Sequence, residues 1–209
     1  MTAQDQTLAN ASAAPATAKP STTDSVAPDP TIGNPDPLPL SLGEMVREDW
    51  IAHGRDWTLP GFRAVAVHRF GVWRMQVKPK LLRAPLSVLY RSLYRKVRNT
   101  YGIELPYTVK LGRRVVVEHQ SNIVIHGYCE IGDDSIIRQG VTLGLRHVDR
   151  PYDAPKLGKG VNIGAGAKLF GCIQVGDNVN IGANAVVLVD VPDNATAVGI
   201  PARIIPPRS

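Results

Sequence analysis

The sequence has few of the residues that stabilise several common classes of small protein. Its 209 residues include two cysteines, Cys129 and Cys172, and 6% aromatic residues. Two cysteines can form only a single disulfide, which excludes a disulfide-rich scaffold. Both stand in the repeated part of the sequence, at positions that suit a small side chain. We therefore expect packed, reduced thiols, and neither a disulfide nor a metal site.

The chain also lacks long apolar segments and nucleic-acid-binding motifs. No apolar run is long enough to span a bilayer, and the N-terminus has neither the basic start nor the apolar stretch of a signal peptide. No helix-turn-helix, zinc-finger or RNA-binding signature accompanies the basic residues. We therefore expect a cytoplasmic protein without a nucleic-acid partner. The net charge of +6 nevertheless indicates an anionic partner or substrate.

Acidic residues are absent from one long stretch, Gly61 to Thr100. The same stretch carries ten basic residues: Arg63, Arg69, Arg74, Lys78, Lys80, Arg83, Arg91, Arg95, Lys96 and Arg98. One interpretation is a solvated face of helices that pack on the end of the fold. The other is adhesion to an anionic membrane surface, which would make the protein peripheral to the inner face of the membrane, or to a lipid-linked glycan. The sequence leaves both open.

Aliphatic residues recur every six positions in the C-terminal half of the chain. One series comprises Leu157, Ile163, Leu169, Val175, Ile181 and Val187; another comprises Ile125, Ile131, Ile137 and Leu143; Leu111 and Val117 share the same step. A period of six fits neither a helix, at 3.6, nor an alternating strand, at 2. It is typical of a parallel β-helix. The alternative is a β-sandwich in which the period arises by chance. Two unbroken series of aliphatic residues argue against it.

A period of six predicts a three-sided prism. Each hexapeptide forms one short strand and a turn, so three hexapeptides close one coil. The aliphatic residues point inward and stack on their equivalents in neighbouring coils, and stability grows with the number of coils. Two irregularities interrupt the period. Leu143 and Leu157 are fourteen apart, two more than twelve, which predicts a loop over 145–156; Val117 and Ile125 are eight apart, which predicts a smaller one over 118–124.

The chain divides into three parts. Residues 1–40 are rich in Ala, Pro, Ser, Thr and Asp and have no periodicity, which predicts a disordered tail. Residues 41–101 are predicted to be helical, with a capping box of Ser41 and Glu44, a second helix over 64–77 and a third that starts near Pro85. Residues 102–205 form the prism.

The residues of the third part resemble the hexapeptide-repeat acyltransferases, and among them the serine O-acetyltransferase type. The resemblance is carried by Gly140–Gly144, Ile163–Lys168, Ile181–Asn184, Val198–Arg203, the pair Glu118–His119 and, before the prism, His68–Trp73. It implies a left-handed parallel β-helix with an N-terminal α-helical segment. It also implies a homotrimer, or a dimer of trimers, with acetyl-CoA as co-substrate in the groove between neighbouring prisms.

The resemblance also implies a catalytic base. In this family a histidine takes the proton of the acceptor hydroxyl, which then attacks the thioester directly, and His119 matches that position. Such a base typically contributes about 10²–10⁴-fold to the rate. Glu104 matches the acidic residue that the family pairs with this base. Glu118, directly before His119, is a further catalytic candidate. Adjacent residues of a strand point to opposite sides, which argues against a direct contact between Glu118 and the imidazole.

The sequence departs from the serine acetyltransferases on the acceptor side. Where they carry an Arg-His pair before Pro-Lys, this chain has Asp153-Ala154, so the second active-site histidine is missing. His147 or Arg146 in the same loop is a candidate replacement in substrate binding. We therefore expect a saccharide hydroxyl as the acceptor, from an exopolysaccharide or a glycan precursor, with L-serine as the alternative.

The acetyl-CoA side of the motif is intact. By resemblance, Gly144, Ala165 and Ala183 are small residues that let the pantetheine arm approach the backbone, and Lys168 and Arg203 are candidates for the CoA phosphates. Two functions of other kinds remain open. A metal-dependent hydratase would use His119, His126 and His147, whereas a trimeric scaffold would have no catalytic residue.

Overall fold

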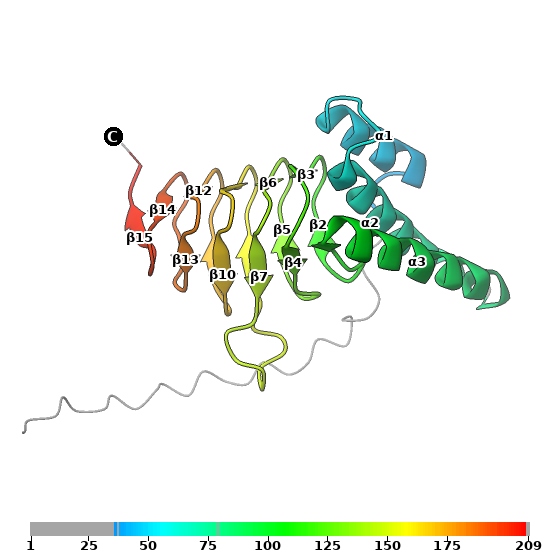
Figure 1. Ribbon diagram of the computed structural model, residues 1–209. Helices are drawn as coiled ribbons and strands as arrows, with labels where there is room; N and C mark the ends of the chain where they lie inside the picture. Colours follow the sequence, from blue (N-terminus) through cyan, green and yellow to red (C-terminus); the bar gives the residue numbers. More distant parts are fainter. Residues whose placement is uncertain (1–35, 37, 79, 208–209) are drawn as a thin grey trace, which may run out of the picture.

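The computed structural model describes residues 36, 38–78 and 80–207 and consists of a helical part followed by a long triangular prism (Figure 1). The expected disordered tail, 1–40, therefore falls almost entirely outside the described residues. The helices are α1 (Leu42–Ala52), α2 (Pro60–Gln76) and α3 (Lys80–Tyr101). They pack at one end of the prism, and the C-terminus lies at the other end.

The first helix begins where its capping residues predict. The Ser41 hydroxyl accepts a hydrogen bond from the Glu44 amide, and the Glu44 carboxylate accepts one from the Ser41 amide, 3.0 Å away. This reciprocal pair satisfies two amides that the first turn of a helix leaves without partners. The predicted capping box is confirmed.

The other two helices start earlier than predicted. Helix α2 starts at Pro60, four residues before Ala64, because a proline at the first helical position loses no hydrogen bond and already has a helical φ. Helix α3 starts at Lys80, so Pro85 lies inside it and does not begin it. One proline removes a single backbone hydrogen bond, which a helix of 22 residues tolerates.

The prism has three faces, each formed by one strand from every coil. Face A comprises β1 (Ile103–Glu104), β4 (Ile123–Ile125), β7 (Thr142–Gly144), β10 (Lys168–Phe170) and β13 (Val186–Val187). Face B comprises β2 (Lys110–Leu111), β5 (Glu130–Ile131), β8 (Lys156–Leu157) and β11 (Gln174–Val175). Face C comprises β3 (Val116–Val117), β6 (Ile136–Ile137), β9 (Asn162–Ile163), β12 (Asn180–Ile181), β14 (Thr196–Val198) and β15 (Arg203–Ile205). Every pairing is parallel except β14 with β15, which ends face C.

The strand register confirms the hexapeptide period and both irregularities. A regular coil has 18 residues, as between Leu169 and Val187. The coil that contains 118–122 has 20, as between Val117 and Ile137. The coil that contains the long loop has 26, as between Leu143 and Leu169. The length of the long loop differs from the prediction. Because β7 and β8 are consecutive strands, Leu143 and Leu157 are one hexapeptide apart. The loop therefore adds eight residues to that hexapeptide, whereas the sequence analysis counted two residues added to two hexapeptides.

The repeated aliphatic residues form one continuous core. All ten members of the two long series are buried. Small residues four positions after four of them are buried as well: Val161, Ala167, Val179 and Ala185. Cys129 belongs to this core, and burial raises the pKa of its thiol to about 12. Cys172, however, is exposed, because it lies in a turn that begins with Gly171 at φ 90°. The expectation of a packed thiol is therefore correct for Cys129 and wrong for Cys172.

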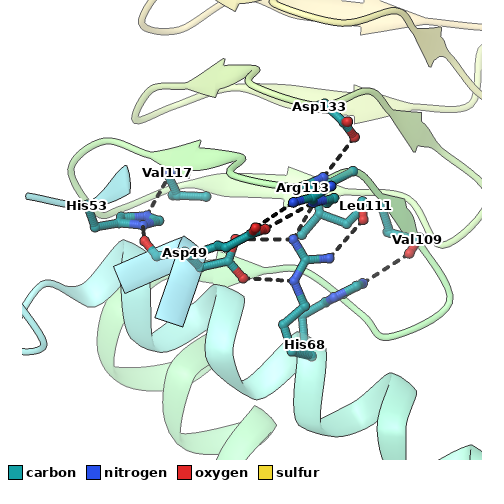
Figure 2. Close-up of polar contacts among 11 residues, drawn as sticks. Asp49, His53, His68, Val109, Leu111, Arg113, Val117 and Asp133 are labelled. Atoms are coloured by element: carbon teal, nitrogen blue, oxygen red, sulfur yellow. Dashed lines mark hydrogen bonds and ion pairs between the residues drawn. The ribbon is translucent and has the colours of Figure 1, made fainter. Parts of the chain in front are cut away.

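A buried ion pair fastens the helices to the first coil (Figure 2). Arg69 of α2 donates from Nε to Asp49 of α1 at 2.8 Å, and both side chains are completely buried. The same guanidinium donates to the backbone oxygens of Leu111 and Gly112, at 2.8 and 2.6 Å. One side chain thus connects two helices with the end of face B. Arg69 is one of the ten basic residues of the acid-free stretch, so part of that stretch holds the fold together.

Two histidines beside this ion pair are buried as well. His68 Nε2 lies 3.0 Å from the Val109 oxygen, and burial lowers the pKa of this histidine to about 3. His53 bonds through Nδ1 to the backbone oxygen of Asp49 at 2.6 Å, and its Nε2 accepts a hydrogen bond from the Val117 amide at 3.2 Å (Figure 2). Burial also lowers the pKa of His53. Both imidazoles are therefore neutral parts of the joint between helices and prism.

None of the helices described is long and apolar enough to cross a membrane.

We expect Arg69→Met to lower the free energy of unfolding by about 3–5 kcal/mol, because it leaves the Asp49 carboxylate buried without a partner. The double variant Arg69→Met/Asp49→Leu removes both charges, so it should be more stable than Arg69→Met alone. Urea unfolding of the three proteins measures the difference. Equal stability of the single and double variants would contradict the role assigned to the pair.

Candidate active site

Several of the predicted site residues lie on one edge of the prism, where the chain turns from face C to face A. Four corners form this C–A edge: 118–122, 138–141, 164–167 and 182–185. Backbone hydrogen bonds connect each corner with the next, from Gly140 to Ser121, from Gly166 to Gln139 and from Asn184 to Ala165, at 2.8–3.0 Å. His119, Ala165 and Ala183 therefore share one edge although up to 64 residues separate them.

His119 lies in the most irregular of these corners. Its side chain is exposed, and its backbone has a left-handed φ of 66°. Ser121 and Asn122 in the same corner also have positive φ, 88° and 55°. Histidine adopts this region more readily than most residues, but three non-glycine residues with positive φ in one corner are unusual. Such backbone conformations concentrate at functional sites. The two residues added here thus turn the imidazole out of the regular wall.

A cavity of about 570 Å³ borders His119. It lies where the connection between α1 and α2 meets the first corner of the C–A edge. The residues that line it are Ala52, His53, Leu59, Pro60, Gly61, Val116, Val117, Glu118, His119 and Gln120. The lining combines apolar side chains with a few polar groups, as is usual for small-molecule sites.

The two carboxylates predicted near His119 lie differently. Glu118 Oε2 is 2.9 Å from Arg138 Nε in the next corner, so Glu118 pairs with a cation instead of the imidazole. Glu104 lies on β1, where it pairs with Val124 in face A. Its charge acts on Tyr94, whose pKa is raised by burial and further by Glu104. No hydrogen bond joins either carboxylate to His119 within the part of the chain that is described, so the pairing of Glu104 with His119 stays a prediction.

The predicted cofactor residues fall into two groups. Ala165 and Ala183 occupy equivalent corners in successive coils, 18 residues apart. Lys168 follows on β10, where its Nζ bonds to the Gly140 oxygen and, at 2.9 Å, to Thr142 Oγ1. Its ammonium group thus already has protein partners. Arg203 is exposed on β15, at the opposite end of face C from β3 and His119.

Gly144, Arg146 and His147 lie elsewhere, at the edge where the chain turns from face A to face B. Gly144 ends β7, and Arg146 and His147 are exposed in the long loop that follows. Arg146 packs near Gly171 of the next coil, because a Cβ on that glycine would lie 3.3 Å from Arg146 Cβ. These three residues therefore occupy the A–B edge, apart from the edge that carries His119.

His126 also lies on the A–B edge, in a cluster of rings with Tyr128 and Tyr152 of the long loop. His119 and His126 thus lie on different edges of one chain, so a metal site that used both would have to take them from different copies at a subunit interface. The residues with a described position contain no group of three or more histidines, cysteines or carboxylates that could hold a metal.

Two residues of the site were given no role in the sequence analysis. His53 accepts from the Val117 amide two residues before His119, and therefore fixes the strand that leads into the corner. Gln139 lies in the second corner, and its Oε1 is buried without a hydrogen-bond partner among the described residues. Neither residue belongs to the hexapeptide period, and only the fold brings them to this edge.

Comparison with known proteins points to one family. No protein-family profile matches the chain. A serine acetyltransferase of Synechococcus elongatus is 40% identical over 146 residues, which are 70% of this chain and 57% of that protein. The structure of Brucella abortus serine acetyltransferase in complex with coenzyme A has a TM-score of 0.68 at 31% identity and matches 80% of this chain and 68% of that chain. Soybean serine acetyltransferase complexed with serine has a TM-score of 0.66 at 31% identity, over 79% and 70%.

The chain belongs to the serine acetyltransferase family. The predicted fold class, a left-handed parallel β-helix with an N-terminal helical segment, is confirmed with it. The chain spans a little over half of the Synechococcus relative. This partial match does not by itself assign the substrates and activity of the whole relatives to this chain.

One departure from the family motif has a clear structural setting. Ala154, which the sequence resemblance matches to the family's second active-site histidine, is 1% exposed and directly precedes Pro155 and β8. Its methyl side chain offers no polar group to a substrate. Beside it, Asp153 Oδ2 lies 3.9 Å from Arg150 Nη1 of the same loop.

We expect Gly61→Ala to disturb the wall of the cavity beside His119. A Cβ at Gly61 would lie 1.9 Å from the Val117 oxygen, so α2 must move away from β3. Overpacking of this kind costs about 1–3 kcal/mol of unfolding free energy. Gly43→Ala is the matched control, because a Cβ there meets nothing within 4 Å and alanine favours the helix. Equal urea midpoints for the two variants would show that the close contact is unimportant.

Proposed function

We propose that the chain is an acetyl-CoA-dependent O-acetyltransferase with His119 as the general base. The observation that carries the proposal is the position of His119: exposed, beside a cavity, and on the same edge as Ala165 and Ala183, in a chain of this family. The relatives are named serine acetyltransferases, and one of their structures contains coenzyme A.

The proposed reaction needs only one proton-transfer residue. His119 takes the proton of the acceptor hydroxyl while the oxygen attacks the thioester carbonyl. The tetrahedral intermediate then expels the CoA thiolate, which takes the proton back from the imidazolium. A backbone amide near Gly144 of a neighbouring copy is the proposed oxyanion donor. No metal enters these steps.

The C–A edge fits a long, thin co-substrate. From β3 to β15, face C spans five strand spacings of about 4.8 Å, or roughly 24 Å. Small residues in successive corners leave the backbone accessible to a pantetheine arm, and Arg203 lies at the far end for a phosphate. Gln139 Oε1, buried and without a hydrogen-bond partner in the described part of the chain, is available to accept a hydrogen bond from an amide of the ligand.

We propose a homotrimer because the candidate residues lie on two edges. Within one chain, His119 is on the C–A edge, whereas Gly144, Arg146 and His147 are on the A–B edge. A site that uses both sets requires the A–B edge of a second copy to face the C–A edge of the first. A closed ring of three such contacts satisfies every copy equally. Whether two trimers associate further depends on the helical end.

L-serine is the acceptor that the comparisons favour, since the relatives carry it in their names and it is bound in the soybean structure. The expected saccharide finds no support there. The saccharide remains the second candidate because of two features of the acceptor side. Glu118 is neutralised by Arg138, so that carboxylate is not free for an amino acid's ammonium group, and Ala154 cannot replace the family's histidine. The expected membrane or glycan contact concerns the helices and is independent of this site.

His119→Ala should reduce acetyl transfer by about 10²–10⁴-fold, because the acceptor hydroxyl loses its base. Binding of CoA should stay unchanged, and the unfolding midpoint should fall only slightly, because the side chain is exposed but alanine adopts the left-handed φ of 66° less readily than histidine. Thiol release from acetyl-CoA, calorimetry with CoA and urea unfolding measure the three quantities. Val148→Ala, 94% exposed in the long loop, is the control. Full activity of His119→Ala would exclude His119 as the base, whereas no acetyl transfer by the wild type would support the non-catalytic scaffold.

Thiol release with different acceptors should distinguish the two acceptor classes. We expect efficient turnover with L-serine if the comparisons identify the acceptor correctly. Turnover with nucleotide sugars or oligosaccharides but not with L-serine would favour the second candidate. In either case His147→Ala should raise the KM of the acceptor more than that of acetyl-CoA, because His147 is assigned to the acceptor. An unchanged acceptor KM would remove His147 from the site.

A further inference from the structure

Helix α3 exposes a group of apolar side chains that has no role in the proposed reaction. In α3, Leu81 is 86% exposed, Leu82 59%, Val88 58% and Leu89 48%. Pro85 is exposed between them. Together these five residues are called here the outer face of α3. Large apolar side chains gathered on an exposed surface indicate an interaction site.

The helix is apolar on two opposite sides. Tyr90 and Val97 are its buried residues, and Tyr90 packs against Tyr107 and Arg74. At 100° per residue, Leu81, Pro85 and Val88 project from the side opposite to Tyr90. Packing on α2 therefore accounts for one side of the helix and leaves the outer face without a partner among the described residues. Figure 1 shows α3 extending sideways beyond the end of the prism, so a flat surface can reach it.

Basic residues lie along one flank of the outer face and continue beyond it toward the C-terminal end of α3. Lys80, Arg91, Arg95, Lys96 and Arg98 are all exposed, and α3 contains no acidic residue. None of the five takes part in an ion pair within the described parts of the chain. Arg69 and Arg74, by contrast, are buried and serve the fold. The charge on α3 is thus free to act on an external partner.

We propose that the outer face of α3 docks on an anionic lipid surface. A helix with an exposed apolar stripe and a basic border is the kind that lies in the interface of a bilayer, its apolar side chains among the acyl chains and its cations beside the headgroups. Each basic residue near such a surface strengthens binding by about fivefold. A soluble polyanion would use the charge but not the apolar stripe.

A second copy of the chain fits this face poorly. A symmetric contact places the same patch against itself, so the basic border of one α3 would face the basic border of the other. No acidic side chain on the helix offsets that repulsion. An anionic bilayer is complementary to both the charge and the apolar residues.

Co-sedimentation with lipid vesicles tests the proposal on the purified full-length protein. We expect binding to vesicles of phosphatidylcholine with one third phosphatidylglycerol, weakened by salt, and little binding to phosphatidylcholine alone. Arg91→Gln/Arg95→Gln should weaken binding roughly 25-fold. Leu81→Gln/Val88→Gln should weaken it roughly tenfold or more, because two apolar side chains no longer enter the bilayer. All four side chains are exposed, so both variants should fold.

Control variants carry changes of the same kind elsewhere, two for the charges and one for the apolar side chains. Arg55→Gln/Lys159→Gln removes two exposed charges, and Val148→Gln replaces an apolar side chain that is 94% exposed. Both should bind as the wild type does. Equal binding to neutral and anionic vesicles, or wild-type binding by the α3 variants, would overturn the proposal. So would a lower oligomeric mass of Leu81→Gln/Val88→Gln, which would identify a second copy as the partner.

This proposal is independent of the acetyltransferase assignment. His119→Ala should bind vesicles as the wild type does, and the α3 variants should retain acetyl transfer to a soluble acceptor. Loss of vesicle binding in His119→Ala would mean that the surface had been misidentified, whatever the enzyme assay shows.

Discussion

The connection between helices and prism depends on one buried guanidinium. Arg69 bonds to Asp49 and to two backbone oxygens of the first coil. An open prism ends in strands whose backbone groups have no further coil to pair with, and such edges need a cover. The helices provide it, and Arg69 satisfies two of the exposed oxygens while its charge is balanced by Asp49. Buried charges without partners are costly, so this joint has a single favourable arrangement.

The joint also positions the candidate site. His53, bonded to the backbone of Asp49 and to the Val117 amide, extends the same network to the strand before His119. Gly61 lets α2 approach that strand closely. The cavity beside His119 therefore has one wall from the helices and one from the prism. The irregular corner, with two residues more than a regular coil allows, turns His119 toward that space.

The basic residues of the acid-free stretch fall into two groups that differ in burial. Arg69 and Arg74 are buried and structural, whereas the cations of α3 are exposed beside an apolar face. The solvated face expected for this stretch is therefore wrong for Arg69 and Arg74, which are buried, and adhesion of the exposed cations to a membrane stays a proposal. An enzyme that acetylates a soluble acceptor has no need of the outer face of α3.

The sequence by itself determined the prism, because burial in a β-helix repeats with the chain and every sixth residue records it. Its two interruptions were also visible, and the resemblance identified His119. The sequence did not determine which residues meet. Ala165 shares an edge with His119 only because coils of 20 and 26 residues bring their corners into line. Arg69 and Asp49, on separate helices, look like ordinary surface charges until packing buries them. Contacts between distant segments depend on register and packing angle, which no local pattern encodes, so only the tertiary structure decided them.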